Sequence, residues 1–359
     1  MLYCLRVGGR GMAETYHVSI AALNEFLQHA LQKVGVPPEH AVRIAEVLID
    51  CELRGYEDHG AYFLHELLGW YSSGAMNPAP QVRVIRETET ATLLDGDCGC
   101  GAIAATEAMR RCIAKARVHG FACAGIRNSG HFIAAGPYAM LAAEAGMIGF
   151  AASNVTPLMA PTGGLTRTFG TNPLAYAVPA GRHFPVLFDM ATSQIAGFKV
   201  RLAALEGREV APGLIEDAQG RPTTNPQDYL NGGLILPVGG YKGYGLAMIV
   251  DVLCGVLTGA GFARTAGVTH GKTGQFFWAL DVEQFMPRAE FLARMDEQID
   301  QVKSSARKEG VAEIFVPGER GLRRKQQLLE QGTVPLSDVT WRVLQEDCAK
   351  LGIPMLTPI

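Results

Sequence analysis

Apolar residues recur every three or four positions at the start of the chain, which is the spacing of helices that bury one face. One such stripe, over residues 20–34, follows Ser19, a good N-cap, and ends at Gly35. Further helices are predicted from residue 38 to about 53 and from 61 to 71. The N-terminal part of the chain is therefore expected to be helical.

The pattern changes after residue 80 to alternation and short apolar runs, which are typical of strands. Strands are predicted at residues 81–86, 90–94, 121–127, 147–153, 174–178, 186–188 and 276–280. Helices are predicted at about 101–119, 138–145, 244–257, 289–308 and 338–351. Residues 154–197 are rich in Gly, Pro and Thr, and loops of this kind often carry binding sites.

Composition narrows the class of protein. The chain has 359 residues, 48% hydrophobic and 19% charged, so it can bury a large core and is expected to form two or three domains. Its net charge is −3 and no five like charges follow one another, which argues against a nucleic-acid surface. The longest apolar run, residues 244–262, contains Asp251 and four glycines, which favours a buried helix over a membrane span.

The N-terminus lacks the long apolar segment of a secretory signal, so the eight cysteines are expected to be reduced thiols in the cytoplasm. Residues 1–14 are interpreted as an extension outside the fold, with Met12 as an alternative start. Cys98 and Cys100 lie close together, but no second Cys or His pair has a zinc-like spacing. No metal site is predicted.

Two glycine-rich runs resemble nucleotide-binding motifs. Residues 99–104, Gly-Cys-Gly-Ala-Ile-Ala, fit G-x-G-x-x-A between a strand and a helix. The next strand ends in Arg127-Asn128 instead of the acid that the NAD fingerprint requires, although an arginine would suit a 2′-phosphate. Residues 270–273, His-Gly-Lys-Thr, resemble the end of a P-loop, but Ala266 stands at the required glycine and a P-loop enzyme is rejected.

A third run, RNSGHFIAAGPY at residues 127–138, places His131 between two glycines and before an apolar helix. It admits three interpretations: a proton carrier, a phosphate cradle at a helix N-terminus, or a tight turn. A second histidine lies in the loop Asp58-His59-Gly60. Both are candidates for proton transfer because the ordinary pKa of histidine is close to neutral pH.

Several runs of the chain, in their order, resemble the malate/L-lactate dehydrogenase family. This family includes L-sulfolactate dehydrogenase, ureidoglycolate dehydrogenase, 2,3-diketogulonate reductase and Δ1-piperideine-2-carboxylate reductase. The resemblance spans about residues 18–354 and rests on DGDCGCG, RNSGHFIAAGPYA, NVTPLMAPTGG, FGTNPLAYAVP, FDMATS, LPVGGYKGYGLAMIVDVLCGVLTG, GQFFWALD and VPGE. It implies an α/β fold with a mixed, largely antiparallel sheet flanked by helices, and not a Rossmann fold. On this basis the motif at residues 99–104 serves only a turn.

The resemblance also implies an activity. The implied protein is an NAD- or NADP-dependent oxidoreductase that interconverts 2-oxo acids, or cyclic 2-imino acids, with 2-hydroxy or amino acids. Residues 15–90 and 285–359 are expected to form a helical substrate and dimer region, and residues 91–284 the NAD(P)-binding domain. The expected partners are a small-molecule substrate and a second copy of the chain, with no nucleic acid or membrane. The alternative is a cofactor-binding member of the family that has lost turnover.

Two histidines are candidates for the proton in this family, and we favour His131 slightly over His59. Asp58 stands where family members typically carry a serine. A buried aspartate there would favour the imidazolium form of His59, whereas in a second interpretation Asp58 only caps the next helix. Lys199 stands where some members carry an aspartate relay partner, so it is a candidate partner of Asp58 and a candidate substrate-site residue.

The resemblance assigns cofactor contacts to several short segments. They comprise His131, Phe132, Ile133, Ala134, Ala135, Thr171, Asp189, Met190, Ala191, Gly239, Gly240 and Lys242. Gly239 and Gly240 lie in a glycine-rich loop that suits phosphate or ribose.

Two positions depart from the family in a way that affects the substrate. Phe63 and Leu67 replace an arginine and a tyrosine, and the arginine is the group that binds the substrate carboxylate. Either another cation takes its place, with Arg54, Arg167 and Lys242 as candidates, or the substrate is bulkier and more apolar. In a third interpretation Phe63 and Leu67 only pack in the core.

Overall fold

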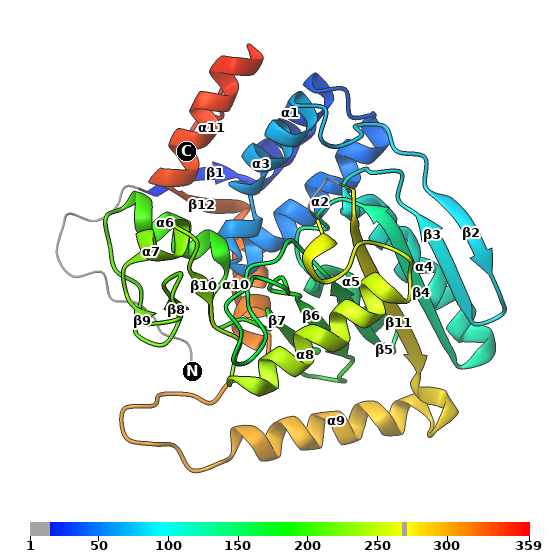
Figure 1. The fold of residues 1–359 in the computed structure, drawn as a ribbon. Coiled ribbons are helices and arrows are strands. Elements are labelled where there is room, and N and C mark those ends of the chain that lie inside the picture. The colour runs from blue at the N-terminus through cyan, green and yellow to red at the C-terminus, as the bar shows by residue number, and fades with distance from the viewer. Residues whose placement is uncertain (1–14, 268–270) are drawn as a thin grey trace.

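A computed structural model describes residues 15–267 and 271–359 and is built around a seven-stranded sheet of order β2-β3-β4-β11-β5-β6-β7 (Figure 1). Its strands are β2 (Arg83–Glu87), β3 (Ala91–Asp95), β4 (Phe121–Ser129), β5 (Met147–Ser153), β6 (Leu174–Val178), β7 (Val186–Met190) and β11 (Thr273–Asp281). Only β3 and β4 pair in parallel, and the other neighbours are antiparallel. The mixed, largely antiparallel sheet predicted from the resemblance is confirmed.

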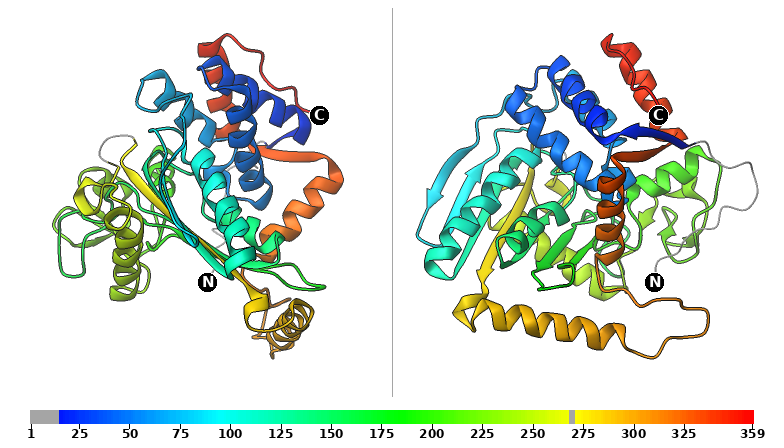
Figure 2. Two further views of the ribbon diagram at one scale, coloured as in Figure 1. Left: turned by 90° about the vertical axis from the view of Figure 1, so that its right-hand side faces the viewer. Right: turned by 180° about the vertical axis from the view of Figure 1, so that it is seen from behind.

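Helices cover both faces of this sheet. Helices α4 (Gly101–His119) and α5 (Gly136–Glu144) pack on one face, and α8 (Tyr241–Asp251) lies on the other (Figure 2). Helix α8 continues into a short π-helical turn, Val252–Val256, which contacts β11. In the described ranges, no helix is both long enough and apolar enough to cross a membrane.

The two ends of the chain meet beside the sheet. Strand β1 (Thr15–Ser19) pairs with β12 (Thr333–Ser337), and this joins the N-terminal helices to the C-terminal ones. These helices are α1 (Ile20–Lys33), α2 (Pro38–Arg54), α3 (Phe63–Ser72), α10 (Glu319–Gln331) and α11 (Asp338–Leu351). One cluster of buried apolar side chains runs from Val18 through the sheet to Ile353. The cluster includes side chains from both predicted regions, residues 15–90 with 285–359 and residues 91–284, and the division itself stays a prediction.

The remaining elements form a small lobe and an outlying helix. The lobe contains α6 (Gly197–Leu205), α7 (Pro226–Leu230) and a three-stranded sheet of β8 (Ile215–Glu216), β9 (Pro222–Thr223) and β10 (Leu234–Ile235). Helix α9 (Arg288–Lys303) lies along the lower edge of the molecule in Figure 1. Short 3-10 turns occur at Glu57–His59, Ala263–Thr265 and Val282–Gln284.

Most elements with a clear apolar period occur where they are predicted. Ser19 caps α1 by accepting the N–H of Ala22, and α2 ends at Gly55 in the left-handed conformation. Helix α10 is missing from the prediction because its sequence, ERGLRRKQQLLEQ, has too few apolar residues to show a stripe. The helix predicted at residues 289–308 occurs as α9, but of its residues only Ile299 is buried.

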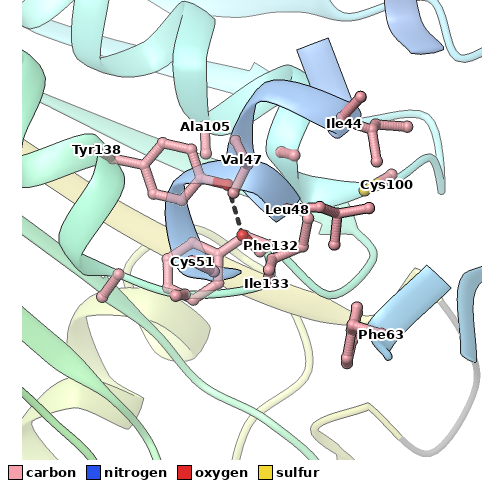
Figure 3. Packing of buried hydrophobic residues seen from close by; sticks show 14 of the residues in the cluster. Ile44, Val47, Leu48, Cys51, Phe63, Cys100, Ala105, Phe132, Ile133 and Tyr138 are labelled. Atoms are coloured by element: carbon pink, nitrogen blue, oxygen red, sulfur yellow. Dashed lines mark hydrogen bonds between the residues drawn. The ribbon is translucent and has the colours of Figure 1, made fainter. Parts of the chain in front are cut away.

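The loop that carries His131 is anchored in the main core. Phe132 and Ile133 point their side chains into it, next to Leu48 and Cys51 of α2 (Figure 3). The buried hydroxyl of Tyr138 donates a hydrogen bond of 2.5 Å to the carbonyl oxygen of Phe132. The backbone next to His131 is thus held by both packing and a buried hydrogen bond.

Candidate active site

The structure brings the two candidate histidines together. His59 comes from the turn between α2 and α3, His131 comes from the loop between β4 and α5, and their ring centroids are 6.0 Å apart. Two further rings adjoin His131: Phe63 at 4.8 Å and Trp70 at 6.1 Å. Trp70 was not among the predicted site residues, because a tryptophan on an apolar helix is usually part of the core.

His131 is held as a neutral imidazole. Its Nδ1 accepts a hydrogen bond of 3.0 Å from the backbone N–H of Ile133, so the ring proton lies on Nε2. Loss of water around the ring, together with the charge of nearby His59, lowers the pKa of His131 to about 3. His131 can therefore donate a hydrogen bond through Nε2, but it is poorly suited to carry a proton near neutral pH.

His59 has the opposite environment. Its Nδ1 lies 3.2 Å from Oδ1 of Asp58, whose side chain is only 13% exposed. Burial alone would raise the pKa of Asp58, but the hydrogen bond and charge of His59, with the charge of Lys199 on α6, hold that pKa below its ordinary value. Asp58 is therefore a carboxylate near neutral pH, and it accepts the hydrogen bond of the Nδ1 of His59.

The alternative interpretation of Asp58 as a helix cap is wrong. Helix α3 begins at Phe63, and its N-cap is Tyr62, which makes no side-chain cap hydrogen bond. The turn before α3 is held by Glu52 instead, whose Oε2 accepts the N–H of Ala61 at 2.7 Å.

Glu52 was missed by sequence reasoning. It is 2% exposed, and burial raises its pKa to about 7, although the N–H of Ala61 acts in the opposite direction. Gly60 approaches this carboxylate so closely that a Cβ atom there would collide with Oε2. The available signal was a single acid within the apolar face of α2, because acids are rarely fully buried without a partner.

The segments expected to contact the cofactor lie in one continuous row. Gly136 at the start of α5 donates its N–H to Oδ2 of Asp189 at 2.8 Å. Next to Asp189, the N–H of Thr192 donates to the carbonyl oxygen of Thr171 at 2.8 Å, and the carbonyl of Thr192 accepts the N–H of Val238 at 2.9 Å. These bonds connect the loop of His131, Thr171, the end of β7 with Met190 and Ala191, and the glycine-rich loop before α8.

The two ends of the row differ in the room that they leave for an anion. In the His131 loop, the N–H groups of Ile133, Ala134 and Gly136 already donate to protein acceptors. Phe132 and Ala135 are buried there as well, which favours the tight-turn interpretation of this loop over the phosphate cradle. At the start of α8 the N–H of Gly240 also donates, to the carbonyl of Pro237, but Gly239 and Gly240 have positive φ, a Cβ at Gly240 would meet open space, and Lys242 is exposed.

Asp189 is a half-buried group in the middle of the row. Burial raises its pKa to about 6, against the effect of the Gly136 N–H and of the charges of His59 and Arg54. It is therefore a carboxylate above about pH 6 and lies within electrostatic range of His59.

The G-x-G-x-x-A motif at residues 99–104 does not form an open site. The N–H of Gly101 donates to the carbonyl of His131, and Cβ atoms at Gly99 and Gly101 would collide with Pro80 and with Gly130, respectively. The N-terminus of α4 is thus covered by protein. The P-loop-like run begins at His270, which lies outside the described residues. Within those residues, no cluster of three or more His, Cys, Asp or Glu side chains could hold a metal ion.

The candidate cations for a substrate carboxylate differ in availability. Arg54 is bound through Nε to Asp50 at 2.7 Å, with a side chain only 2% exposed. Arg167 donates to the backbone carbonyls of Tyr229 and Gly233. Lys199 is exposed on α6 and acts electrostatically on Asp58. Leu67 is buried, as the interpretation that it only packs in the core predicts.

Comparison with known proteins identifies the family. Residues 18–345 match the family model for malate/L-lactate dehydrogenases. The chain belongs to this family. A malate dehydrogenase of Pyrococcus abyssi is 37% identical over 92% of this chain and 94% of its own length, and an L-sulfolactate dehydrogenase of Methanocaldococcus jannaschii is 35% identical over 90% and 94%. The solved malate dehydrogenase of Pyrococcus horikoshii superposes with a TM-score of 0.88 at 34% identity, covering 97% of this chain and 99% of that one.

Membership of the malate/L-lactate dehydrogenase family establishes the general class of activity. The chain is an oxidoreductase of the hydroxy acid dehydrogenase and reductase type. Dehydrogenases of this family use nicotinamide cofactors. The row of segments beside His131 fits such a group, because the loop before α8 leaves open backbone next to an exposed lysine.

The buried carboxyl of Glu52 predicts a pH effect on stability. Its folded pKa of about 7 lies above the ordinary value of 4.5, so its contribution is fully present below pH 4.5 and is lost as the pH rises through 7. Glu52→Gln keeps an oxygen acceptor for Ala61 without a charge. At pH 8 this variant is expected to unfold with a free energy about 2 to 3 kcal/mol higher than the wild type, as measured by urea titration.

At pH 4.5 the two proteins are expected to have nearly equal stability. The matched control is Glu39→Gln, because Glu39 is an exposed acid on the same helix, α2. Equal stability of wild type and Glu52→Gln at pH 8 would contradict the assignment.

Proposed function

We propose that the chain is an NAD- or NADP-dependent oxidoreductase that interconverts a 2-oxo acid, or a cyclic 2-imino acid, with the corresponding 2-hydroxy or amino acid. The observation that carries this proposal is the Asp58–His59 pair beside neutral His131, at one end of the row of expected cofactor segments. When bound, the nicotinamide supplies or accepts the hydride. The chain's own residues orient the substrate and move the proton.

His59 is the proposed proton carrier and Asp58 the group that accepts the hydrogen bond of its Nδ1. This exchanges the roles favoured from sequence, because the Nδ1 of His131 is occupied by Ile133. In the proposal, Nε2–H of His131 donates a hydrogen bond to the reacting oxygen or nitrogen of the substrate. One histidine then polarises the reacting group while the other delivers the proton.

The cofactor is proposed to lie along the row described above. Gly239, Gly240 and Lys242 would hold its phosphates, because a helix N-terminus with open backbone and a nearby amine suits anions. Thr171, Asp189, Met190 and Ala191 lie between this end and the histidines and would adjoin the nicotinamide side, with the backbone of residues 131–135.

Calorimetry with NADH and NADPH tests the cofactor. Binding of at least one of them is expected, and no binding at millimolar concentration would refute the proposal. Binding without turnover of any 2-oxo or imino acid would instead support the alternative, a family member that keeps the cofactor but not the reaction.

The pH dependence of kcat/KM tests the division of roles. His59→Asn is expected to lower kcat/KM by about 10²- to 10⁴-fold and to abolish the limb set by the proton carrier. His131→Phe is expected to lower kcat/KM by about tenfold, the value of one hydrogen bond, without changing the shape of the profile, because His131 is neutral throughout. Loss of that limb in His131→Phe, with its retention in His59→Asn, would reverse the assignment.

We further propose that the protein is a cytoplasmic homodimer. The seven cysteines of the described ranges are free thiols, which suits a reducing compartment. The outward face of α8 and the π turn exposes a continuous set of apolar side chains: Leu246, Met248, Ile249, Val252, Val256 and Leu257. A face of this kind on a family member expected to dimerise favours a contact between two copies.

Sedimentation velocity tests the dimer. Wild type is expected to sediment with the mass of two chains, and Ile249→Glu, which places a charge in the apolar face, is expected to dissociate it. Val118→Glu is the control, because Val118 is 76% exposed on α4, which packs on the other face of the sheet. A wild-type monomer, or a dimer unaffected by Ile249→Glu, would contradict the proposed contact.

A further inference from the structure

The wall of the site around the two histidines is aromatic. Phe63 lies 5.7 Å from His59 in a stacked arrangement and 4.8 Å from His131 in a tilted one. Trp70 lies edge-on to Phe63 at 5.7 Å. Such a wall offers a substrate apolar contact area and ring stacking.

The charges around this wall are engaged with one another or out of reach of a ligand. Asp58 is ionised beside His59, and half-buried Asp189 lies within electrostatic range of the same ring. Arg54 is bound through Nε to Asp50, and although its Nη1 has no hydrogen-bond partner among the described residues, its side chain is only 2% exposed. Lys199 on α6 also acts electrostatically on Asp58, and this lysine is exposed. Among the cations that act on these carboxylates, it is therefore the one available to a ligand.

This distribution has a consequence for substrates that differ in charge. Lys199 can meet one carboxylate. A second anionic group would lie against Phe63 and Trp70 and near the carboxylate of Asp58, where its desolvation is not compensated. An apolar side chain in the same position would gain contact with the aromatic wall.

We propose that the site selects 2-oxo acids with one carboxylate and a branched or aromatic side chain, that it discriminates against those with a second anionic group, and that Phe63 sets this preference. The proposal rests on the reductase function proposed above. It separates this chain from relatives named for malate or sulfolactate, since both of those compounds carry two anionic groups.

The test compares kcat/KM and calorimetric affinity of the cofactor-loaded protein for four compounds. Phenylpyruvate and 4-methyl-2-oxopentanoate are the expected substrates, and oxaloacetate and sulfopyruvate are the dianionic competitors. At least a tenfold preference for the first pair is expected in both measurements. A preference for oxaloacetate or sulfopyruvate overturns the selectivity but leaves the reductase proposal standing.

The calorimetric affinities distinguish a failure of the selectivity proposal from a failure of the reductase proposal. Selective binding of phenylpyruvate without any turnover overturns the reductase function and supports the selectivity. Binding of none of the four compounds overturns the selectivity, whatever the enzyme does with other substrates.

Variants at Phe63 test the residue itself. Phe63→Arg is expected to shift the ratio of kcat/KM values at least tenfold towards oxaloacetate, and Phe63→Leu, the apolar control, is expected to keep the preference. Because Phe63 is 8% exposed, a thermal melt accompanies each variant. If Phe63→Arg does not fold, the assignment is judged on Phe63→Leu: a fall, relative to the wild type, in the ratio of kcat/KM for phenylpyruvate to that for 4-methyl-2-oxopentanoate supports it, because the stacking ring is lost, and an unchanged ratio overturns it.

Discussion

Strand β11 lies between β4 and β5, and this long-range pairing holds the two halves of the main sheet together. The first residues of the same strand also fix the site. The side chains of Thr273 and Gln275 donate to the carbonyl oxygens of Ser129 and Gly130, which directly precede His131. A strand from the last third of the chain therefore determines where the His131 loop leaves the sheet, and everything that this loop contacts follows from that placement.

The chemistry of the site arises from giving two identical side chains different surroundings. His131 loses water and its Nδ1 is occupied by the N–H of Ile133, so it stays neutral. His59 has a carboxylate at its Nδ1 instead, because Asp58 is ionised there. Backbone geometry and one aspartate thus give different hydrogen-bond partners to two rings 6.0 Å apart.

The fold of the family and the local substitutions determine different properties of the protein. The match over residues 18–345 and the superposition with a solved malate dehydrogenase establish the family and the fold. Asp58 and Phe63 leave that scaffold intact. They change the charge next to His59 and the polarity of the wall, which are properties of a few contacts rather than of the fold.

The sequence by itself determined the elements with a clear apolar period, such as α1 and the strands of the sheet, and the motifs that identify the family. It did not reveal α10, which has too few apolar residues, or the pairing of β1 with β12, whose partners are far apart in the chain. Nor did it reveal the buried carboxyl of Glu52 or which histidine is neutral. Periodicity reports which face of one element is buried, whereas the protonation of a side chain depends on groups that distant segments bring to it, and only the tertiary structure decides those contacts.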